Sequence, residues 1–261
     1  MRTAVIDALG KIPVISSVMR WAARQYRDGS VTNIKSGLLA GKKWKRHKRF
    51  VNGYWVSIYE LPLQHAIWNN LSEGDVFYDL GANGGFFSLL AAIRVGPTGY
   101  VYAFEPDKEN SATIPDQFDL NGVTWAEVVE LAVSDKAGQA AFKCGECSTS
   151  RLVESPTDCT SLVQTVTLDE FSLTHRAPSL VKIDVEGIEA AVLRGSSNVL
   201  GTLRPKLLIE LHDERNCTEC ARILKTHGYT ITALSESPMP NGKEMPHHIL
   251  AQYGKIEGVR G

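Results

Sequence analysis

From residue 75 onward, short and almost wholly apolar segments alternate with longer segments that show a helical spacing of apolar residues. The short segments predict strands that are buried on both faces, which is typical of a parallel sheet covered by helices. Strands are expected at 75–81, 99–106, 126–134, 163–168, 180–187, 206–214, 229–234 and 247–253.

The longer segments predict the helices that connect these strands. The first, 85–96, ends at a Gly-Pro pair, and the second, 107–122, ends at an Asn-Gly pair. Pro115 should kink the second helix, because proline removes a backbone donor. The alternation of strands and helices predicts an α/β fold. Two further helices are expected at 188–200 and 217–228, and a glycine-punctuated loop between 134 and 163.

The first part of the chain follows a different pattern. A rough apolar stripe between residues 5 and 21 predicts a helix, which either caps the main domain or lies on a membrane surface through its Arg and Trp residues. Asn52-Gly53, between aromatic and β-branched residues, predicts a hairpin. We therefore divide the chain into an accessory segment, 1–59, and a main domain, 60–261.

Composition narrows the class of protein. The chain has 261 residues, of which 43% are hydrophobic and 22% charged, and its formal net charge is −1. These values argue against a globally basic nucleic-acid-binding protein, and no segment reaches the ~18 apolar residues of a membrane span. Five cysteines, an odd number in a chain too large to need disulfides, indicate a cytoplasmic protein.

Two local features leave several interpretations open. The strongly basic run 42–49 fits a solvated hairpin face, a groove for an anionic substrate, or an arm that binds nucleic acid. The C-x-x-C pairs Cys144/Cys147 and Cys217/Cys220 fit a zinc site, a redox pair or ordinary reduced thiols.

The glycine-rich turn after the first strand indicates a nucleotide site. A phosphate-binding loop would require a Lys after the glycines, and a dinucleotide fingerprint would require glycine where Asn83 stands. Asp79 ends the strand, where its charge would repel a pyrophosphate but suits a cationic ligand. S-adenosylmethionine carries an ammonium and a sulphonium and no phosphate, so the turn predicts this cofactor.

Glu105 ends the next strand, where a carboxylate can accept hydrogen bonds from both hydroxyls of a ribose. Ser134 and Asp135 follow the third strand at the same sheet edge. The predicted cofactor contacts are Asp79, Gly81, Asn83, Gly85, Glu105, Ser134 and Asp135.

Five segments in this order resemble the FkbM family of S-adenosylmethionine-dependent methyltransferases: FYDLGANGGFFSLLAA, GYVYAFEPDKEN, LAVSDKAG, LVKIDVEGIEAAVLRG and LLIELHDE. KIDVEGIE is the most specific of the quoted motifs, and the resemblance extends roughly from Glu60 to Gln252. It implies a Rossmann-like class I fold whose seven-stranded, mostly parallel sheet has an antiparallel last strand. It also implies O-methylation of a hydroxyl, typically on a sugar or a secondary metabolite.

The strand ends that follow Glu105 carry the candidate residues for the acceptor. Alternation places Lys182, Asp184 and Glu186 on one side if the strand stays extended. Asp184 would orient the acceptor hydroxyl, with Lys182 as its partner. His212 would take the proton, so activity should rise with pH through roughly 6–7.

Other roles are assigned at the same edge. Magnesium held by Asp184, Asp213 and Glu210 is the alternative route to an activated hydroxyl. Glu189 begins a helix, where its negative charge should interact favourably with the positive end of the helix dipole. His65, His175 and the His247–His248 pair should be structural or exposed.

The sequence therefore predicts an O-methyltransferase that acts on a small-molecule or glycan acceptor. An RNA methyltransferase and a non-catalytic cofactor-binding module are the alternatives. We expect the N-terminal segment and the basic hairpin to serve acceptor recognition rather than cofactor binding, because both precede the cofactor motifs.

Overall fold

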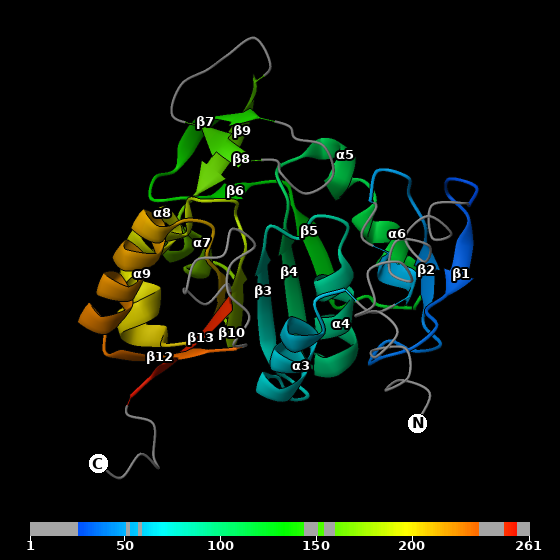
Figure 1. The fold of residues 1–261 in the computed structure, drawn as a ribbon, viewed down its shortest axis with the longest axis horizontal. Helices are drawn as coiled ribbons and strands as arrows, with labels where there is room; N and C mark the ends of the chain where they lie inside the picture. The colour runs from blue at the N-terminus through cyan, green and yellow to red at the C-terminus, as the bar shows by residue number, and fades with distance from the viewer. Residues whose placement is uncertain are drawn as a thin grey trace.

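The computed structural model describes residues 26–50, 53–56, 59–143, 151–153, 160–234 and 248–254. It confirms the predicted α/β fold with a central seven-stranded sheet between helices (Figure 1). The strand order is β12-β13-β11-β10-β3-β4-β5, in which only β13 runs antiparallel to its neighbours. The strands are β3 (Val76–Leu80), β4 (Tyr100–Phe104), β5 (Ala126–Val129), β10 (Leu180–Ile183), β11 (Lys206–Glu210), β12 (Tyr229–Ala233) and β13 (His248–Tyr253).

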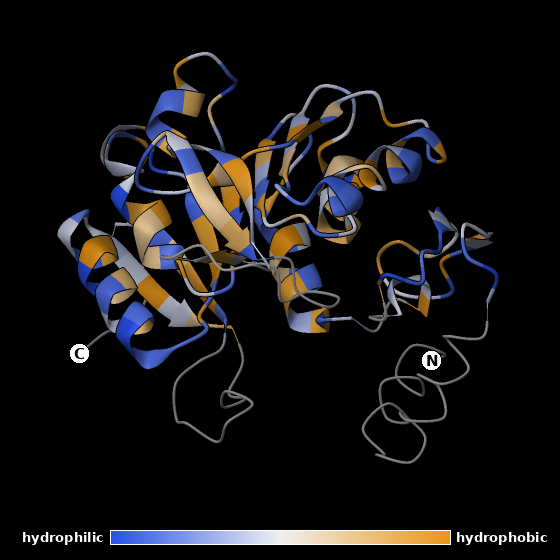
Figure 2. Ribbon diagram, turned by 90° about the horizontal axis from the view of Figure 1, so that it is seen from above, coloured by the Kyte–Doolittle hydropathy of each residue, from blue (hydrophilic) through white to orange (hydrophobic). Residues whose placement is uncertain are grey.

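Alternate side chains of the central strands enter two separate cores. Phe77 of β3 packs with α3 (Leu61–Asn70), α4 (Phe86–Val95) and α6 (Ile114–Asp119) on one face. Its neighbours Val76 and Tyr78 pack with the helices on the other face. Hydrophobic residues are concentrated in the middle of the molecule (Figure 2). The second face is covered by α7 (Leu168–Ser172), α8 (Glu189–Arg194), the π-helical turn η2 (Val199–Leu203) and α9 (Glu214–Thr226).

Two predicted helices differ from the structure in their limits. The expected helix 107–122 is two short helices, α5 (Lys108–Ser111) and α6, and Pro115 lies in the first turn of α6 instead of kinking one helix. The expected helix 188–200 ends at Arg194, before η2.

A second, four-stranded sheet was not predicted. It has the order β6-β9-β7-β8 and lies at one end of the central sheet (Figure 1). The expected strand 126–134 splits into β5 and β6, and the expected loop contains β7. The expected strand 163–168 ends at Val166, because Thr167 caps α7 in a capping box. The four strands are β6 (Ala132–Val133), β7 (Gly138–Lys143), β8 (Arg151–Val153) and β9 (Thr160–Val166).

The described part of the N-terminal segment packs on the main domain. β1 (Val31–Asn33) and β2 (Lys43–Lys45) form an antiparallel pair, and Trp44 of β2 is buried in the same core as α4. The hairpin expected at Asn52-Gly53 is wrong in its second arm, since Tyr54–Val56 forms a 3-10 turn, while Asn52 lies outside the described residues. The predicted helix in 5–21, and with it the predicted membrane contact, also lies outside them.

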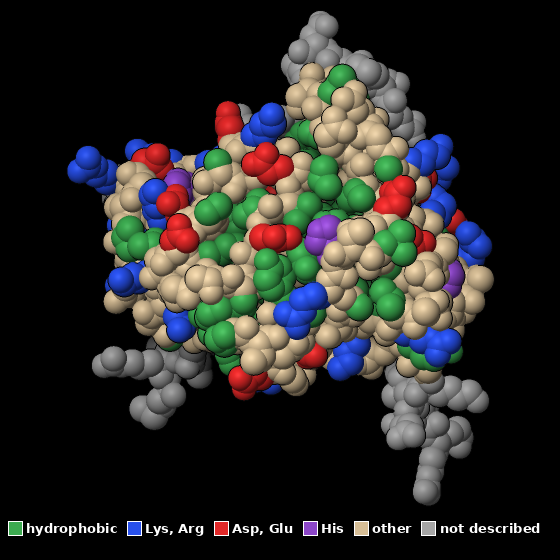
Figure 3. Space-filling view, turned by 180° about the vertical axis from the view of Figure 1, so that it is seen from behind, with side chains coloured by type: hydrophobic (Ala, Val, Ile, Leu, Met, Phe, Trp, Pro, Cys, Tyr) green, Lys and Arg blue, Asp and Glu red, His purple; other side chains and the backbone are tan. Residues whose placement is uncertain are grey.

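The basic run is engaged by the main domain. Lys45 Nζ lies 2.8 Å from Asp116 Oδ2, and the Arg46 guanidinium stacks over the rings of Tyr26 and Trp55. Acidic and basic side chains are intermixed on the face seen in Figure 3. Lys45 therefore ties the run to the main domain and Arg46 ties it to the rest of the N-terminal segment, while the three roles considered for the run stay predictions. A search of the described residues for a helix able to span a membrane finds none.

Candidate active site

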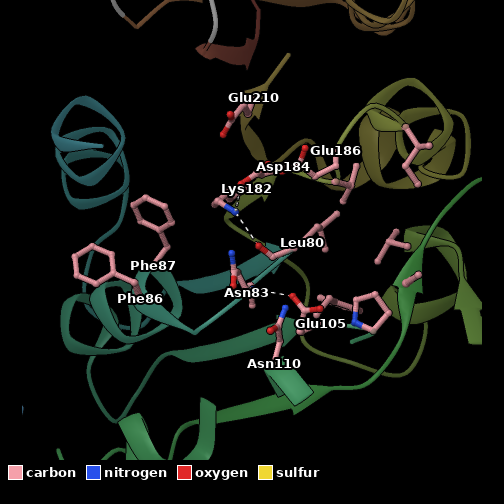
Figure 4. A pocket seen from close by; sticks show the side chains of 18 of the residues that line it. Leu80, Asn83, Phe86, Phe87, Glu105, Asn110, Lys182, Asp184, Glu186 and Glu210 are labelled. Carbon is pink, nitrogen blue, oxygen red and sulfur yellow. Dashed lines mark hydrogen bonds and ion pairs between the residues drawn. The ribbon is translucent and has the colours of Figure 1, made fainter. Parts of the chain in front are cut away.

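A cavity of about 240 Å³ lies at the carboxyl ends of β3, β4, β10 and β11. Figure 4 shows its polar side chains in two groups. One group, which we call the Glu105 end, consists of Asn83, Glu105 and Asn110. The second group, the Asp184 end, consists of Glu60, Lys182, Asp184, Glu186 and Glu210.

The glycine turn brings β3 and β10 together. Gly81 has φ +80°, and a Cβ there would lie 1.9 Å from the carbonyl oxygen of Asp184, so only glycine fits. Gly81 and Asn83 line the cavity, as predicted for cofactor contacts. Gly85 is not among the described lining residues. Its φ is +79° at the start of α4, and a Cβ there would meet Ile114 at 2.8 Å, so its role is in packing.

Glu105 is held by backbone donors on both sides. Its Oε2 accepts from Asn83 N at 2.8 Å, and its Oε1 accepts from Asp107 N at 2.9 Å. Burial raises its pKa to about 7 in spite of these hydrogen bonds. Each carboxylate oxygen has about two lone pairs, so the pair can also accept from two hydroxyls of a ligand.

Arg49 of the basic run supports the Glu105 end. Its Nη2 lies 2.6 Å from Asp107 Oδ2, and its guanidinium also donates to Asn110 and Glu109. Asp107 in turn caps α5 and presents the N–H that binds Glu105. We expected the basic segment to serve acceptor recognition alone. Arg49 instead supports Glu105, a predicted cofactor contact, through Asp107.

Asp79 lies beneath the cavity and is not among its described lining residues. It is 0% exposed, and its Oδ2 accepts from Ser88 Oγ at 2.6 Å. Its Oδ1 lies 3.1 Å from Lys182 Nζ. The predicted direct contact of Asp79 with a cationic ligand is thus corrected, because Lys182 already neutralises this carboxylate.

Lys182 joins Asp79 to Asp184, as the predicted pairing of Lys182 with Asp184 requires. Its Nζ lies 3.4 Å from Asp184 Oδ2 and donates to Gly81 O at 3.2 Å. Burial alone would lower the pKa of this ammonium, but the carboxylates of Asp79 and Asp184 raise it well above its ordinary value.

His212 is oriented by a carboxylate that the sequence assigned to a helix dipole. Its Nδ1 lies 2.8 Å from Oε1 of Glu189, which is 0% exposed. Its Nε2 faces Glu186 at 3.4 Å, and Asp184 and Glu210 at 3.7 Å each. These three carboxylates line the cavity. His212 is not among the described lining residues and contacts the carboxylates from the side away from the cavity.

The charges around His212 change its expected acidity. Burial would lower its pKa, but Glu189, Asp184 and Glu210 raise it to about 9. The predicted value near neutrality is therefore wrong. Burial and the proximity of Glu210 raise the pKa of Asp184 to about 8, against the attraction of Lys182 and His212.

His248 and Glu60 were missed as members of this site. His248 Nε2 lies 3.3 Å from Glu210 Oε2 and 3.6 Å from Glu60 Oε2, and the residue is 8% exposed. The expectation of a merely structural or exposed histidine is wrong, because β13 places His248 directly opposite Glu210. The pairing of His248 with Glu210 could have revealed this role, but it can be read only once β13 is known to lie beside β11.

Backbone strain is concentrated at the cavity. Glu60, Asn83 and Glu186 have φ of +42°, +51° and +56°, and all three line it. Side chains other than glycine adopt this region at a cost, and such residues cluster at functional sites. β10 ends at Ile183, and the left-handed turn at Glu186 lies beyond it, yet Lys182, Asp184 and Glu186 all line the cavity.

Three predicted residues have other roles. Ser134 N bonds to Val166 O, and Asp135 lies 3.6 Å from Arg194, so the adjacent Leu131, Ala132 and Val133 line the cavity instead. Asp213 is the N-cap of α9 and accepts from Asn216 N at 2.8 Å, which corrects its assignment as a metal ligand. Among the described residues, the acid and histidine groups close enough to share an ion are Asp184, Glu210 and His212, and Glu60, Glu210 and His248.

The cysteines are described only in part. Cys217 and Cys220 lie in α9 as free thiols, and Cys220 is buried. Cys144 and Cys147 lie outside the described residues, so the choice between a zinc site, a redox pair and ordinary reduced thiols stays open.

Known proteins share both the sequence pattern and the fold. The methyltransferase FkbM domain matches residues 79–231. Hexuronic acid methyltransferase AglP of Haloferax volcanii is 26% identical over 142 residues, which cover 54% of this chain and 57% of that protein. The 31-O-demethyl-FK506 methyltransferase FkbM of Streptomyces tacrolimicus is 27% identical over 225 residues, covering 73% of this chain and 84% of that protein.

The crystal structure of methyltransferase FkbM from Methylobacillus flagellatus KT has the same fold. It superposes with a TM-score of 0.51 at 19% identity, over 70% of this chain and 44% of that one. The family match covers more than half of this chain and includes the glycine turn, Glu105, Asp184 and His212. The predicted resemblance is confirmed: the chain belongs to the FkbM family of methyltransferases.

Proposed function

We propose that the protein transfers a methyl group from S-adenosylmethionine to a hydroxyl of a sugar or a small metabolite. Two of its relatives are named for a hexuronic acid and for 31-O-demethyl-FK506. The observation that carries the proposal is a single cavity that joins Glu105 at one end to Asp184, flanked by Lys182 and His212, at the other.

The residues of the cavity fit this cofactor. Glu105 presents a carboxylate for the ribose hydroxyls, and the turn at Gly81 and Asn83 contains no Lys for a phosphate. Carboxylates near the opposite end suit the ammonium of the methionine part. When bound, S-adenosylmethionine would supply an electrophilic methyl group, which an acceptor oxygen would attack in line while S-adenosylhomocysteine leaves. Apolar side chains for an adenine come from Leu131, Ala132, Val133, Phe142 and Leu152.

Asp184 is the group that we propose receives the acceptor proton. It lines the cavity, and a carboxylate with a pKa of about 8 is a stronger base than an ordinary aspartate. Lys182 and His212 lie on its two sides and hold its position, while Glu189 fixes the His212 ring. This assignment moves the proton acceptor from His212 to Asp184, so activity should rise with pH through about 8.

A divalent cation is the second route to the same chemistry. Asp184 and Glu210 would offer oxygen ligands and His212 a nitrogen, and the ion would lower the pKa of a bound hydroxyl. We expect EDTA to leave activity unchanged, because the His212 imidazolium already compensates these carboxylates. Activity that is lost in EDTA and restored by magnesium would favour the metal route.

The decisive experiment is a methyl-transfer screen with labelled S-adenosylmethionine against glycan and metabolite extracts. Label in a hydroxyl-bearing acceptor, lost in Asp184→Asn while S-adenosylhomocysteine still binds, would support the proposal. Binding of S-adenosylhomocysteine without turnover on any pool would favour a non-catalytic module. Label transferred chiefly to RNA would favour the nucleic-acid alternative.

A further inference from the structure

The donors at the Asp184 end are already committed to carboxylates of the protein. Lys182 is the single Lys or Arg among the described lining residues. An ammonium has three N–H groups, and Lys182 has three oxygen partners, on Gly81, Asp79 and Asp184. A substrate carboxylate would have to displace one of these buried partners to reach it.

The two histidines are committed in the same way. His212 has Glu189 at Nδ1 and three carboxylates around Nε2. His248 Nε2 lies between Glu60 and Glu210. Each ring thus faces protein carboxylates, and both are cationic partners of groups that line the cavity.

Carboxylates outnumber the cations around this end. Three cations, Lys182, His212 and His248, face six carboxylates. Two carboxylates remain in excess even when Asp184 is protonated below its pKa of about 8, and the methionine part of a bound cofactor carries a carboxylate as well as an ammonium. The carboxylates are Glu60, Asp79, Asp184, Glu186, Glu189 and Glu210.

Aromatic rings form an adjacent wall of the same cavity. Tyr59, Phe86 and Phe87 contact one another, and the Tyr59 and Phe87 ring centroids are 5.6 Å apart. Lys182 Nζ lies 5.5 Å from the centre of the Phe87 ring. A surface that combines apolar ring faces with hydrogen-bond acceptors suits a ligand with C–H faces and many O–H or N–H donors.

We infer that the Asp184 end selects a donor-rich acceptor, a neutral or amine-bearing polyhydroxylated ring, and rejects acceptors that carry a carboxylate or phosphate beside the reacting hydroxyl. The inference rests on the proposed function and names its substrate class, and it predicts that this chain differs in the charge of its acceptor from the relative named for a hexuronic acid. Like-charge repulsion across a desolvated contact is a common source of such discrimination.

Three matched cofactor analogues test this inference without knowledge of the natural acceptor. In each, a tertiary amine replaces the sulphonium, and the methyl group is replaced by a 2-hydroxyethyl, a 2-aminoethyl or a carboxymethyl arm that points toward the acceptor. Calorimetry on the full chain should show the aminoethyl compound binding at least as tightly as the hydroxyethyl compound. The carboxymethyl compound should bind at least ~10-fold more weakly.

Charge-neutral variants assign the effect to the cluster. Glu186→Gln and Glu210→Gln should each reduce the penalty on the carboxymethyl arm, whereas Glu127→Gln, on exposed β5, should leave it unchanged. The inference would be overturned if the carboxymethyl compound bound as tightly as the hydroxyethyl compound. It would also be overturned if both cavity variants kept the full wild-type penalty on the carboxymethyl arm. Failure of S-adenosylhomocysteine itself to bind would instead contradict the proposed function.

Discussion

The two ends of the cavity are built in different ways. Glu105 is held by backbone N–H groups, one from Asp107 two residues away and one from Asn83 in the glycine turn of the neighbouring strand β3. The Asp184 end is assembled from side chains of β10, β11, β13, α8 and the residue before α3, joined mainly by ion pairs. The first arrangement holds one carboxylate rigidly, whereas the second couples many charges.

This difference predicts where substitutions act. A change at the Glu105 end should alter the binding of the cofactor and leave the bound complex able to react. A change at the Asp184 end should alter proton transfer and pH dependence, because each charge there sets the pKa of its neighbours.

The largest expected effect is at Asp184. Asp184→Asn keeps the shape of the side chain and removes the proposed proton acceptor, so kcat should fall by roughly 10²–10⁴. Affinity for S-adenosylhomocysteine, measured by calorimetry, should change little. Near-normal turnover in this variant would place the proton acceptor elsewhere.

Glu105→Ala should have the opposite profile. Loss of hydrogen bonds to a charged group costs about 1.5–3 kcal/mol, so S-adenosylhomocysteine should bind more weakly by roughly one to two orders of magnitude. Turnover at saturating cofactor should remain close to that of the wild type. Unchanged affinity would mean that Glu105 does not hold the ribose.

Stability should fall as the pH rises from about 6.5 to 9.5. His212 and His248 have folded pKa values of about 9, and Asp184 has one of about 8, all above their ordinary values. The folded chain therefore binds more protons than the unfolded chain in this window, and the free energy of unfolding should drop by several kcal/mol. Urea unfolding at both pH values measures the change. His212→Asn should reduce the loss of stability between the two pH values. A free energy of unfolding that rises with pH would contradict the assignment.

The smallest expected effect is at Arg49, which acts on Glu105 through Asp107. Arg49→Gln should weaken S-adenosylhomocysteine several-fold, because a partly exposed ion pair contributes on the order of 1 kcal/mol. Arg49→Lys should restore part of the affinity, and Lys45→Gln, which loses a comparable ion pair with Asp116, should not affect it. Equal losses of S-adenosylhomocysteine affinity in Arg49→Gln and Lys45→Gln would mean that Arg49 acts by holding the N-terminal segment on the main domain and not through Asp107 and Glu105.

The sequence was most informative where the site is local. Glu105 could be predicted because it directly ends the strand after the glycine turn. Buried apolar runs predicted a parallel sheet covered by helices, whereas the number of seven strands came from the family resemblance. Asp79 was placed on the correct strand, but its partner Lys182 depends on β3 and β10 being neighbours in register.

The parts that could not be predicted depend on long-range pairing. His248 joins the site because β13 lies beside β11, and Glu60 joins it from the residue that precedes α3. The second sheet was missed because its strands are short or rich in Ser, Thr and Gln, as in β9, and carry little apolar signal. Glu189 was assigned to a helix dipole because its contact with His212 joins the start of α8 to the segment after β11, which are 23 residues apart in the chain.

The central claim is that the two ends of one cavity divide binding from chemistry. A crystal structure with S-adenosylhomocysteine tests it most directly. The account predicts both ribose hydroxyls within hydrogen-bond distance of Glu105, and the sulphur directed toward the Asp184 end. A ribose bound by Asp184 or Glu210, with Glu105 free of contacts, would contradict it.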